Sequence, residues 1–144
     1  MSTEPIRALP ALLATLAPQL HDGVYVYARI EGPLPSGLQP LALFREAEGL
    51  TVIVEEEAAQ RLGLSPLLRA AWITLAVHSD LQSVGLTAAF ATALAEAGVG
   101  CNVVAAACHD HLFVPVAEAD AAMAALLALQ ARAMAATGRS TIRP

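Results

Sequence analysis

Residues 72–115 read WITLAVHSDLQSVGLTAAFATALAEAGVGCNVVAAACHDHLFVP and carry the clearest secondary-structure pattern of the chain. It opens with a nearly continuous apolar segment, 72–77, which is typical of an interior β-strand. A loop leads into a predicted helix over about 85–97, which has an apolar stripe and glycines at its end. Two more predicted strands, 102–107 and 112–116, flank a short turn. The stretch therefore predicts a strand, a helix and a hairpin in that order.

Shorter elements are predicted on both sides of this stretch. Residues 24–30 alternate apolar and polar side chains, as a half-buried strand does. Residues 31–40 hold three prolines and two glycines, so a loop is predicted where the second half of the chain has a helix. The remaining predicted elements are a short N-terminal helix within 6–20, strands at 41–45 and 50–54, a helix at 55–62 and a final helix at 118–134.

An internal repeat links the two halves of the chain. LTVIVEEEAA at 50–59 aligns without a gap with LFVPVAEADA at 112–121, at an offset of 62 residues. The preceding strands are predicted to keep this offset, with Leu41 against Val103. Each half then reads strand, connection, strand, strand, helix, and a duplication is the preferred interpretation. Such a unit predicts an antiparallel sheet with its helices on one face.

The stretch 72–116 resembles the ACT domain, a small βαββαβ module that binds amino acids. Over about 20–135 the chain is similar to stand-alone bacterial proteins with two ACT domains in tandem, and to the aspartokinase regulatory region and the cytosolic arginine sensors. This resemblance implies an α+β fold of two ferredoxin-like units in tandem. The units expected from it are a degenerate N-terminal unit, 1–70, with a loop in place of its first helix, and a C-terminal ACT domain, 71–136, followed by a flexible tail, 137–144. No strand follows the last predicted helix, and an N-terminal strand can fill that place.

The resemblance also implies a small-molecule regulatory or sensor protein, with an amino acid as the expected ligand, and not an enzyme. In ACT domains the ligand is held by the loop after the first strand, the start of the first helix and the facing second strand. The family often has an acidic residue and a Pro-Gly pair in this loop; Asp80 matches the acid, but Val84 precedes Gly85 here. The positions that correspond to the ligand site are Ser79, Asp80, Ser83, Val84, Gly85, Leu86, Thr87 and Asn102.

The residues of this loop favour a ligand site on chemical grounds as well. A glycine between a strand and a helix lets the backbone approach a ligand closely. The free N–H groups of the first helical turn favour a carboxylate, and Asp80 could pair with an ammonium group. The alternative is structural: Ser83 or Asp80 caps the helix, and Gly85 eases a tight turn. The sequence alone leaves both interpretations open.

A cluster of potential metal ligands lies at the hairpin, where Cys108, His109 and His111 are close in sequence. Cys101 precedes Cys108 by seven positions. On one strand Cys101 and Cys108 would face opposite sides about 20 Å apart, so they can share neither a metal ion nor a disulfide. A polar hairpin tip is the preferred interpretation, and no cofactor or metal is expected. A metal site at the turn stays an alternative.

Two further alternatives to a sensor stay open. An enzyme could use His78, Asp80 and His109, although a nucleophile elbow is missing from the sequence. A structural protein-interaction module would have a large apolar interface and no pocket at the loop 79–87. The acids Glu55–Glu57 are assigned to the first turn of a helix, where they suit its dipole.

The composition limits the classes of partner. The chain has 144 residues, 56% of them hydrophobic and 15% charged, and a formal net charge of −5, without a basic run, so nucleic-acid binding is not expected. Its longest apolar run, 121–129, is shorter than the roughly twenty residues of a membrane span, so no membrane is expected. Without an export signal and with two cysteines, the chain is predicted to be cytoplasmic. The expected partners are an amino acid, a second copy in a homodimer and an unknown protein.

Overall fold

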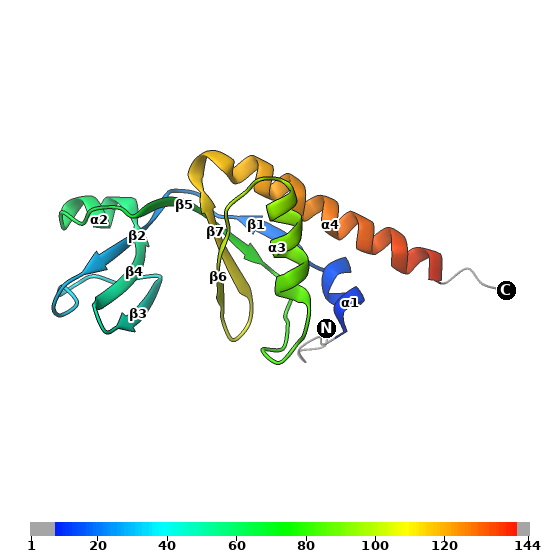
Figure 1. Cartoon of the computed structure of the whole chain (residues 1–144), viewed down its shortest axis with the longest axis horizontal. Coiled ribbons are helices and arrows are strands. Elements are labelled where there is room, and N and C mark those ends of the chain that lie inside the picture. The colour runs from blue at the N-terminus through cyan, green and yellow to red at the C-terminus, as the bar shows by residue number, and fades with distance from the viewer. Residues whose placement is uncertain (1–7, 141–144) are drawn as a thin grey trace.

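The computed structural model describes residues 8–140 as a curled antiparallel sheet with its helices on one face (Figure 1). The strands follow the order β3-β4-β2-β5-β7-β6, and β1 pairs with β5 on the same side as β2. The elements are α1 (Leu9–Ala14), β1 (Pro18–Leu20), β2 (Tyr25–Ile30), β3 (Ala42–Glu46), β4 (Gly49–Glu55), α2 (Glu56–Arg61), β5 (Leu68–Leu75), α3 (Leu86–Glu96), β6 (Asn102–Ala105), β7 (Asp110–Pro115), a 3₁₀ turn η1 (Val116–Glu118) and α4 (Ala119–Ser140).

Strand β5 is shared by two units. Its residues 68–70 pair with β2, and its residues 73–75 pair with β1. β5 is therefore the last strand of a first unit made of β2, β3, β4 and α2, and the first strand of a second unit made of β5, α3, β6, β7 and α4. β1 completes the second unit, in the place that an N-terminal strand was expected to fill. The predicted fold class, two ferredoxin-like units in tandem, is confirmed.

The N-terminal segment differs from the single helix predicted within 6–20. α1 has six residues, Ala17 takes a positive φ of 45°, and a strand begins at Pro18. Proline cannot continue a helix, and the pairing of β1 with β5 depends on residues more than fifty positions away. Leu12 and Leu16 are fully buried in the core of the second unit. The segment that opens the chain therefore packs on the second unit and not on the first.

The helix-covered face of the sheet holds two apolar cores. In the second unit α3 and α4 cover the sheet, and α1 packs against both helices. In the first unit the cover is the short α2, with Leu38 and Leu64 packed beside it. Residues 31–41 form a loop at the place that α3 has in the second unit. The largest fully buried side chains of the second core are Phe90, Leu12, Leu16, Ile73, Leu75, Leu94, Leu112 and Leu126.

The opposite face of the sheet is covered by none of the described helices, yet it is strongly apolar. Ile53, Ala70 and Phe113 are each no more than 3% exposed there. They are buried because the sheet curls and brings this face round on itself (Figure 1). By the alternation of side chains along each strand, this helix-free face carries five of the six aromatic residues of the chain, namely Tyr25, Tyr27, Phe44, Trp72 and Phe113.

The two hairpins have different registers, which corrects one part of the predicted repeat. Leu50 pairs with Arg45, whereas its counterpart Leu112 pairs with Val103. Val103 therefore corresponds to Arg45 and not to Leu41. The second hairpin has a longer turn, so the offset of 62 that relates β4 to β7 does not continue into β3 and β6.

The last helix is longer than predicted. α4 continues to Ser140, so residues 137–140 are helical and not part of a tail, while residues 141–144 lie outside the described part of the chain. By length and composition Val116–Gly138 could cross a membrane, with a mean hydropathy of 1.2. Ala122 and Leu126 of this helix are fully buried in the second core, so this end of the helix packs on the sheet, although only 11% of its apolar 18-residue window is buried.

Candidate functional site

The loop between β5 and α3 borders a cavity of about 60 Å³. Five of the eight residues predicted for a ligand site line it: Ser79, Asp80, Ser83, Leu86 and Thr87. The other lining residues are Leu81, Ala105 and Asp110. The strand-to-helix loop, the first turn of α3 and the hairpin end of β6 and β7 therefore meet at one place.

Local hydrogen bonds give the loop its shape. The Asp80 side chain accepts a hydrogen bond from the backbone N–H of Gln82 at 2.7 Å, and the Asp80 carbonyl accepts one from Ser83 N at 2.9 Å. Gly85 then starts α3 with a φ of +102°, which favours glycine. A Cβ at Gly85 would lie 3.0 Å from Leu9 Cδ2 of α1, so the loop also packs closely on the N-terminal helix.

The N-terminus of α3 is the electropositive side of the cavity. The N-cap residue of α3 is Gly85, and no side-chain cap hydrogen bond is made there in the described part of the chain. The first turn of α3 also contains no acidic residue. Leu86 and Thr87 of this turn line the cavity. Its first N–H groups and the helix dipole therefore favour a carboxylate or another small anion.

Asp110 supplies the opposite charge, although it was not among the residues predicted from the sequence. The side chain is 6% exposed, and burial raises the pKa of its carboxyl, while His111, a hydrogen bond from Ser79 and His109 partly offset this. The strand alternation was the available signal: Leu112 faces the core, so Asp110, two residues earlier, faces the same side. The turn itself is formed by residues 106–109, with the Ala106 N–H bonded to the His109 carbonyl. Asp110 is therefore a buried strand residue and not part of a solvated tip.

The other predicted residues lie differently. Val84 is 85% exposed and does not line the cavity, and Gly85 contributes through its backbone conformation. Asn102 pairs with Phe113 at the end of β6 that is remote from the hairpin turn. Because β6 runs from Asn102 toward the turn, it is Ala105 that reaches the loop.

The cysteines and histidines of the second unit do not form one cluster. Cys101 is half-buried before β6, Cys108 is exposed in the turn, and the His109 ring lies 3.3 Å from the Val77 carbonyl. Within the described residues, the His, Cys, Asp and Glu side chains give no group of three or more that could hold a metal ion. Burial raises the pKa of the Cys101 thiol to about 11.

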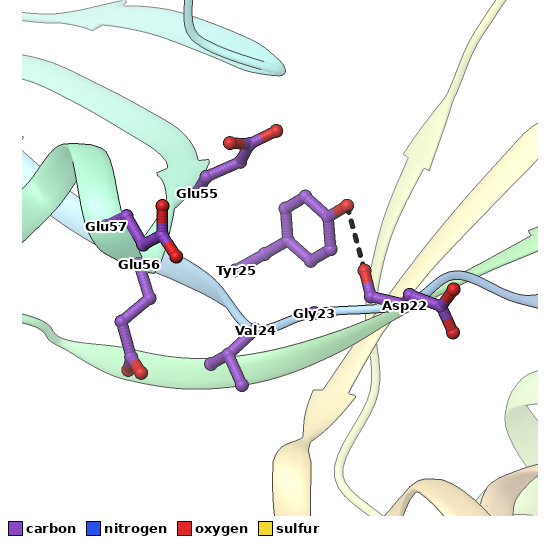
Figure 2. Close-up of a pocket in the computed structure, with 7 residues that line it drawn as sticks. All are labelled: Asp22, Gly23, Val24, Tyr25, Glu55, Glu56 and Glu57. Atoms are coloured by element: carbon purple, nitrogen blue, oxygen red, sulfur yellow. Dashed lines mark hydrogen bonds between the residues drawn. The ribbon is translucent and has the colours of Figure 1, made fainter.

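A second, larger cleft of about 450 Å³ is acidic (Figure 2). Glu55 and Glu57 bring carboxylates to it, and the Tyr25 hydroxyl donates to the backbone carbonyl of Asp22 at 3.2 Å, while the Asp22 carboxylate points away from these side chains. Burial, together with the charges of Glu55 and Asp22, raises the pKa of Tyr25. Glu56 points to Arg69, which it binds through two hydrogen bonds of 2.5 and 3.1 Å. The cleft is open and would attract cations, but its acids also suit the first turn of α2, as the sequence predicts.

Comparisons with known proteins agree with this architecture. Residues 4–70 match one family model for the ACT domain, and residues 68–128 match another. A Vibrio cholerae protein of unknown function, described as a possible transport protein, is 44% identical, with a TM-score of 0.78 over 88% of this chain and 99% of that one. The ligand-free regulatory subunit of aspartate kinase from Thermus thermophilus is 14% identical, with a TM-score of 0.62 over 80% of this chain and 97% of that one. An Agrobacterium tumefaciens protein is 17% identical, with a TM-score of 0.59 over 78% and 87% of the two chains. No curated protein matches the chain significantly.

Proposed function

The chain belongs to the tandem ACT domain proteins, and from this premise we propose that it is an amino-acid-binding regulatory protein without catalytic activity. ACT domains and the regulatory subunits that resemble this chain support a small-molecule regulatory role. The ligand enters the cavity between the β5–α3 loop and the hairpin end of β7. The observation that carries this proposal is the pairing of opposite charges across one small cavity.

The two sides of the cavity suit the two charges of an α-amino acid. The first turn of α3 binds the carboxylate through backbone N–H groups, and Asp110 binds the ammonium group. Asp110 is buried and its pKa is raised, so a cationic partner also relieves the cost of its charge. Because the cavity is small, a ligand with a short side chain is favoured.

A thermal-shift screen of the full chain against the twenty amino acids, followed by calorimetry, tests this function. A ligand at about 100 times its dissociation constant stabilises the folded state by about 2.7 kcal/mol, which is a clear rise in melting temperature. Asp110→Asn removes the negative charge and abolishes the shift, whereas Glu118→Gln, in the 3₁₀ turn η1 before α4, leaves it unchanged. No shift with any amino acid at millimolar concentration contradicts the proposal.

Binding of the ligand changes the packing of the helices, and a partner protein responds to this change. The ligand joins the loop before α3 to β7, and α3 packs on α4, so occupancy shifts helices on the outer surface that a partner protein reads. The site of action is the cytoplasm.

A homodimer is the second part of the proposal. β3 is an outer strand of the sheet, and Leu41, Leu43 and Phe44 at its edge are all exposed, Phe44 by 71%. An exposed apolar outer strand favours pairing with a second copy. Light scattering gives a dimer for the native chain and a monomer for Phe44→Glu, while Leu127→Glu on α4 stays dimeric.

A further inference from the structure

A separate cavity of about 120 Å³ lies on the helix-free face of the sheet. Its position is unusual because the two outer strands of the sheet both reach it: β3 from the first unit and β6 from the second. The curl of the sheet brings these strands toward each other on the helix-free side (Figure 1). The lining residues are Leu41, Ala42, Trp72, Val104, Ala106, His111 and Phe113.

The walls of this cavity are apolar and well supported. Trp72 and Phe113 stack at a centroid distance of 6.5 Å with an interplanar angle of 13°. Tyr27 meets Phe113 edge-on, which fixes the second ring from the side of the first unit. None of the lining residues carries a full charge apart from the titratable His111.

The imidazole of His111, which lines this cavity, is a hydrogen-bond donor. Trp72 Nε1 donates to His111 Nδ1 at 3.1 Å, and an indole nitrogen can only donate, so Nδ1 carries no proton. The neutral imidazole then bears its hydrogen on Nε2. Thr74 Oγ1 lies 3.0 Å from the same Nδ1 and 2.7 Å from His21 Nε2, and these contacts hold the ring in place.

The Nε2–H of His111 makes no hydrogen bond to any of the described residues. Burial and the nearby His109 and His21 lower the pKa of His111, which favours the neutral ring. The cavity therefore combines apolar walls with a lining imidazole whose Nε2–H is available to a ligand. A ligand complementary to it has one ring and one acceptor atom, and carries no charge.

We propose that this cavity binds a small, uncharged, planar molecule with one aromatic ring and a carbonyl oxygen that accepts a hydrogen bond from His111 Nε2. The cavity of about 120 Å³ is smaller than the roughly 150 Å³ that takes up benzene in a closed core, but it opens to solvent, so one ring enters it and the rest of the ligand lies at its mouth. A free amino acid does not fit this chemistry, because both of its charges would be buried against apolar walls. The cavity is therefore distinct from the loop site. Its ligand bridges β3 to β5 and β7, and so fixes the angle between the two units.

The experiment uses benzamide as the probe and toluene as the matched ring without an acceptor. Trp72 is the only tryptophan, so its fluorescence and its single indole N–H signal in ¹H–¹⁵N spectra report on this cavity alone. Benzamide is expected to shift the indole signal in a saturable manner, with an affinity several-fold higher than that of toluene. Absence of a saturable shift, or equal affinity for the two probes, overturns the proposal.

Two substitutions localise the binding. Ala42→Leu fills the cavity from β3 and abolishes the benzamide response, whereas Ala47→Leu makes the same change in the exposed β3–β4 turn and preserves it. His111→Phe keeps a ring but loses the donor, so benzamide and toluene bind equally. Thermal unfolding verifies that each variant is folded. A benzamide response that survives Ala42→Leu in the folded protein, or a preference for benzamide that survives His111→Phe, overturns the assignment.

Discussion

The imidazole ring of His21 lies flat on the indole ring of Trp72, with centroids 3.5 Å apart and planes 8° apart. The same two residues are joined by their backbones, since the His21 N–H donates to the Trp72 carbonyl at 2.9 Å. His21 follows β1, the strand that completes the second unit, so this stack fastens the N-terminal segment to the helix-free face. Through the buried hydroxyl of Thr74, it also connects His21 to His111.

This network predicts a loss of stability in mild acid. Burial lowers the pKa of both His21 and His111 below the usual 6.5, so the unfolded chain binds more protons than the folded one. The stability they contribute is complete above about pH 6.5, the pKa of an unperturbed histidine, and is lost as the pH falls toward their lowered folded values. Protonation of His111 at Nδ1 also breaks its hydrogen bond from Trp72.

Urea unfolding of the full chain between pH 5 and 8 measures this effect. The raised pKa of Asp110 has the opposite sign, because its contribution is lost as the pH rises, so the series is run in an Asp110→Asn background. In that background, replacing both His21 and His111 by Asn flattens the dependence between pH 5 and 6.5. An unchanged slope in the double variant contradicts the assignment to these two residues.

The second prediction concerns the effect of a side chain at Gly85 on the free energy of unfolding. Its φ of +102° favours glycine, and a Cβ would approach Leu9 Cδ2 to 3.0 Å. Gly85→Ala is therefore expected to lower the free energy of unfolding by about 1–3 kcal/mol, the usual cost of a strained backbone conformation. Gly100→Ala is the matched control, since a methyl group added there would have nothing within 4 Å and its φ is outside the left-handed region. Equal urea midpoints for the two variants contradict this interpretation of the loop.

The elements that the sequence predicts well are those whose pattern is local. The alternation in 24–30 and the periodicity of 85–97 both reflect burial that the neighbouring residues determine, and β2 and α3 lie there. The sequence does not predict which residues form β1, because its strand conformation depends on β5, far away in sequence. Asp110 was missed for a related reason, since the turn chemistry of CHDH suggested a solvated tip although the strand had already begun.

The helix-free face illustrates the same limit at the level of the sheet. The alternation of residues 24–30 places Tyr25 and Tyr27 on one face of their strand, but the sequence could not reveal that Trp72 and Phe113 join them. That grouping follows from the pairing order and curl of the strands. Glycine and polar residues between a strand and a helix are a local signal, so the sequence could point to the loop that borders the small cavity, whereas Asp110 of β7 also lines that cavity.

The two cysteines predict a difference in reactivity. Burial raises the pKa of Cys101 to about 11, whereas Cys108 is exposed in the hairpin turn. Only the thiolate is nucleophilic, so at pH 8 the thiolate population of Cys101 is about 100-fold below that of a thiol with the usual pKa. Iodoacetamide is expected to modify Cys108 first. Mass spectrometry of samples taken over time measures the modified fraction of each cysteine. Cys108→Ser leaves only the slow phase and Cys101→Ser only the fast one; similar rates for both thiols contradict the burial of Cys101.

The packing of the N-terminal segment predicts that the second unit depends on it. Leu16 is fully buried against the core that α3 and α4 cover, although it lies more than fifty residues from β5. Leu16→Ala is expected to cost about 2–5 kcal/mol, as large-to-small substitutions in a core do. Leu20→Ala, on the partly exposed end of β1, is the matched control and costs much less.

Because Leu12, Leu16 and β1 all belong to the second unit, a fragment that begins at residue 71 lacks both a strand and part of its core. Circular dichroism should find this fragment unfolded. A folded, cooperatively melting fragment of this kind would contradict the shared architecture, since it would mean that β1 and α1 contribute nothing essential.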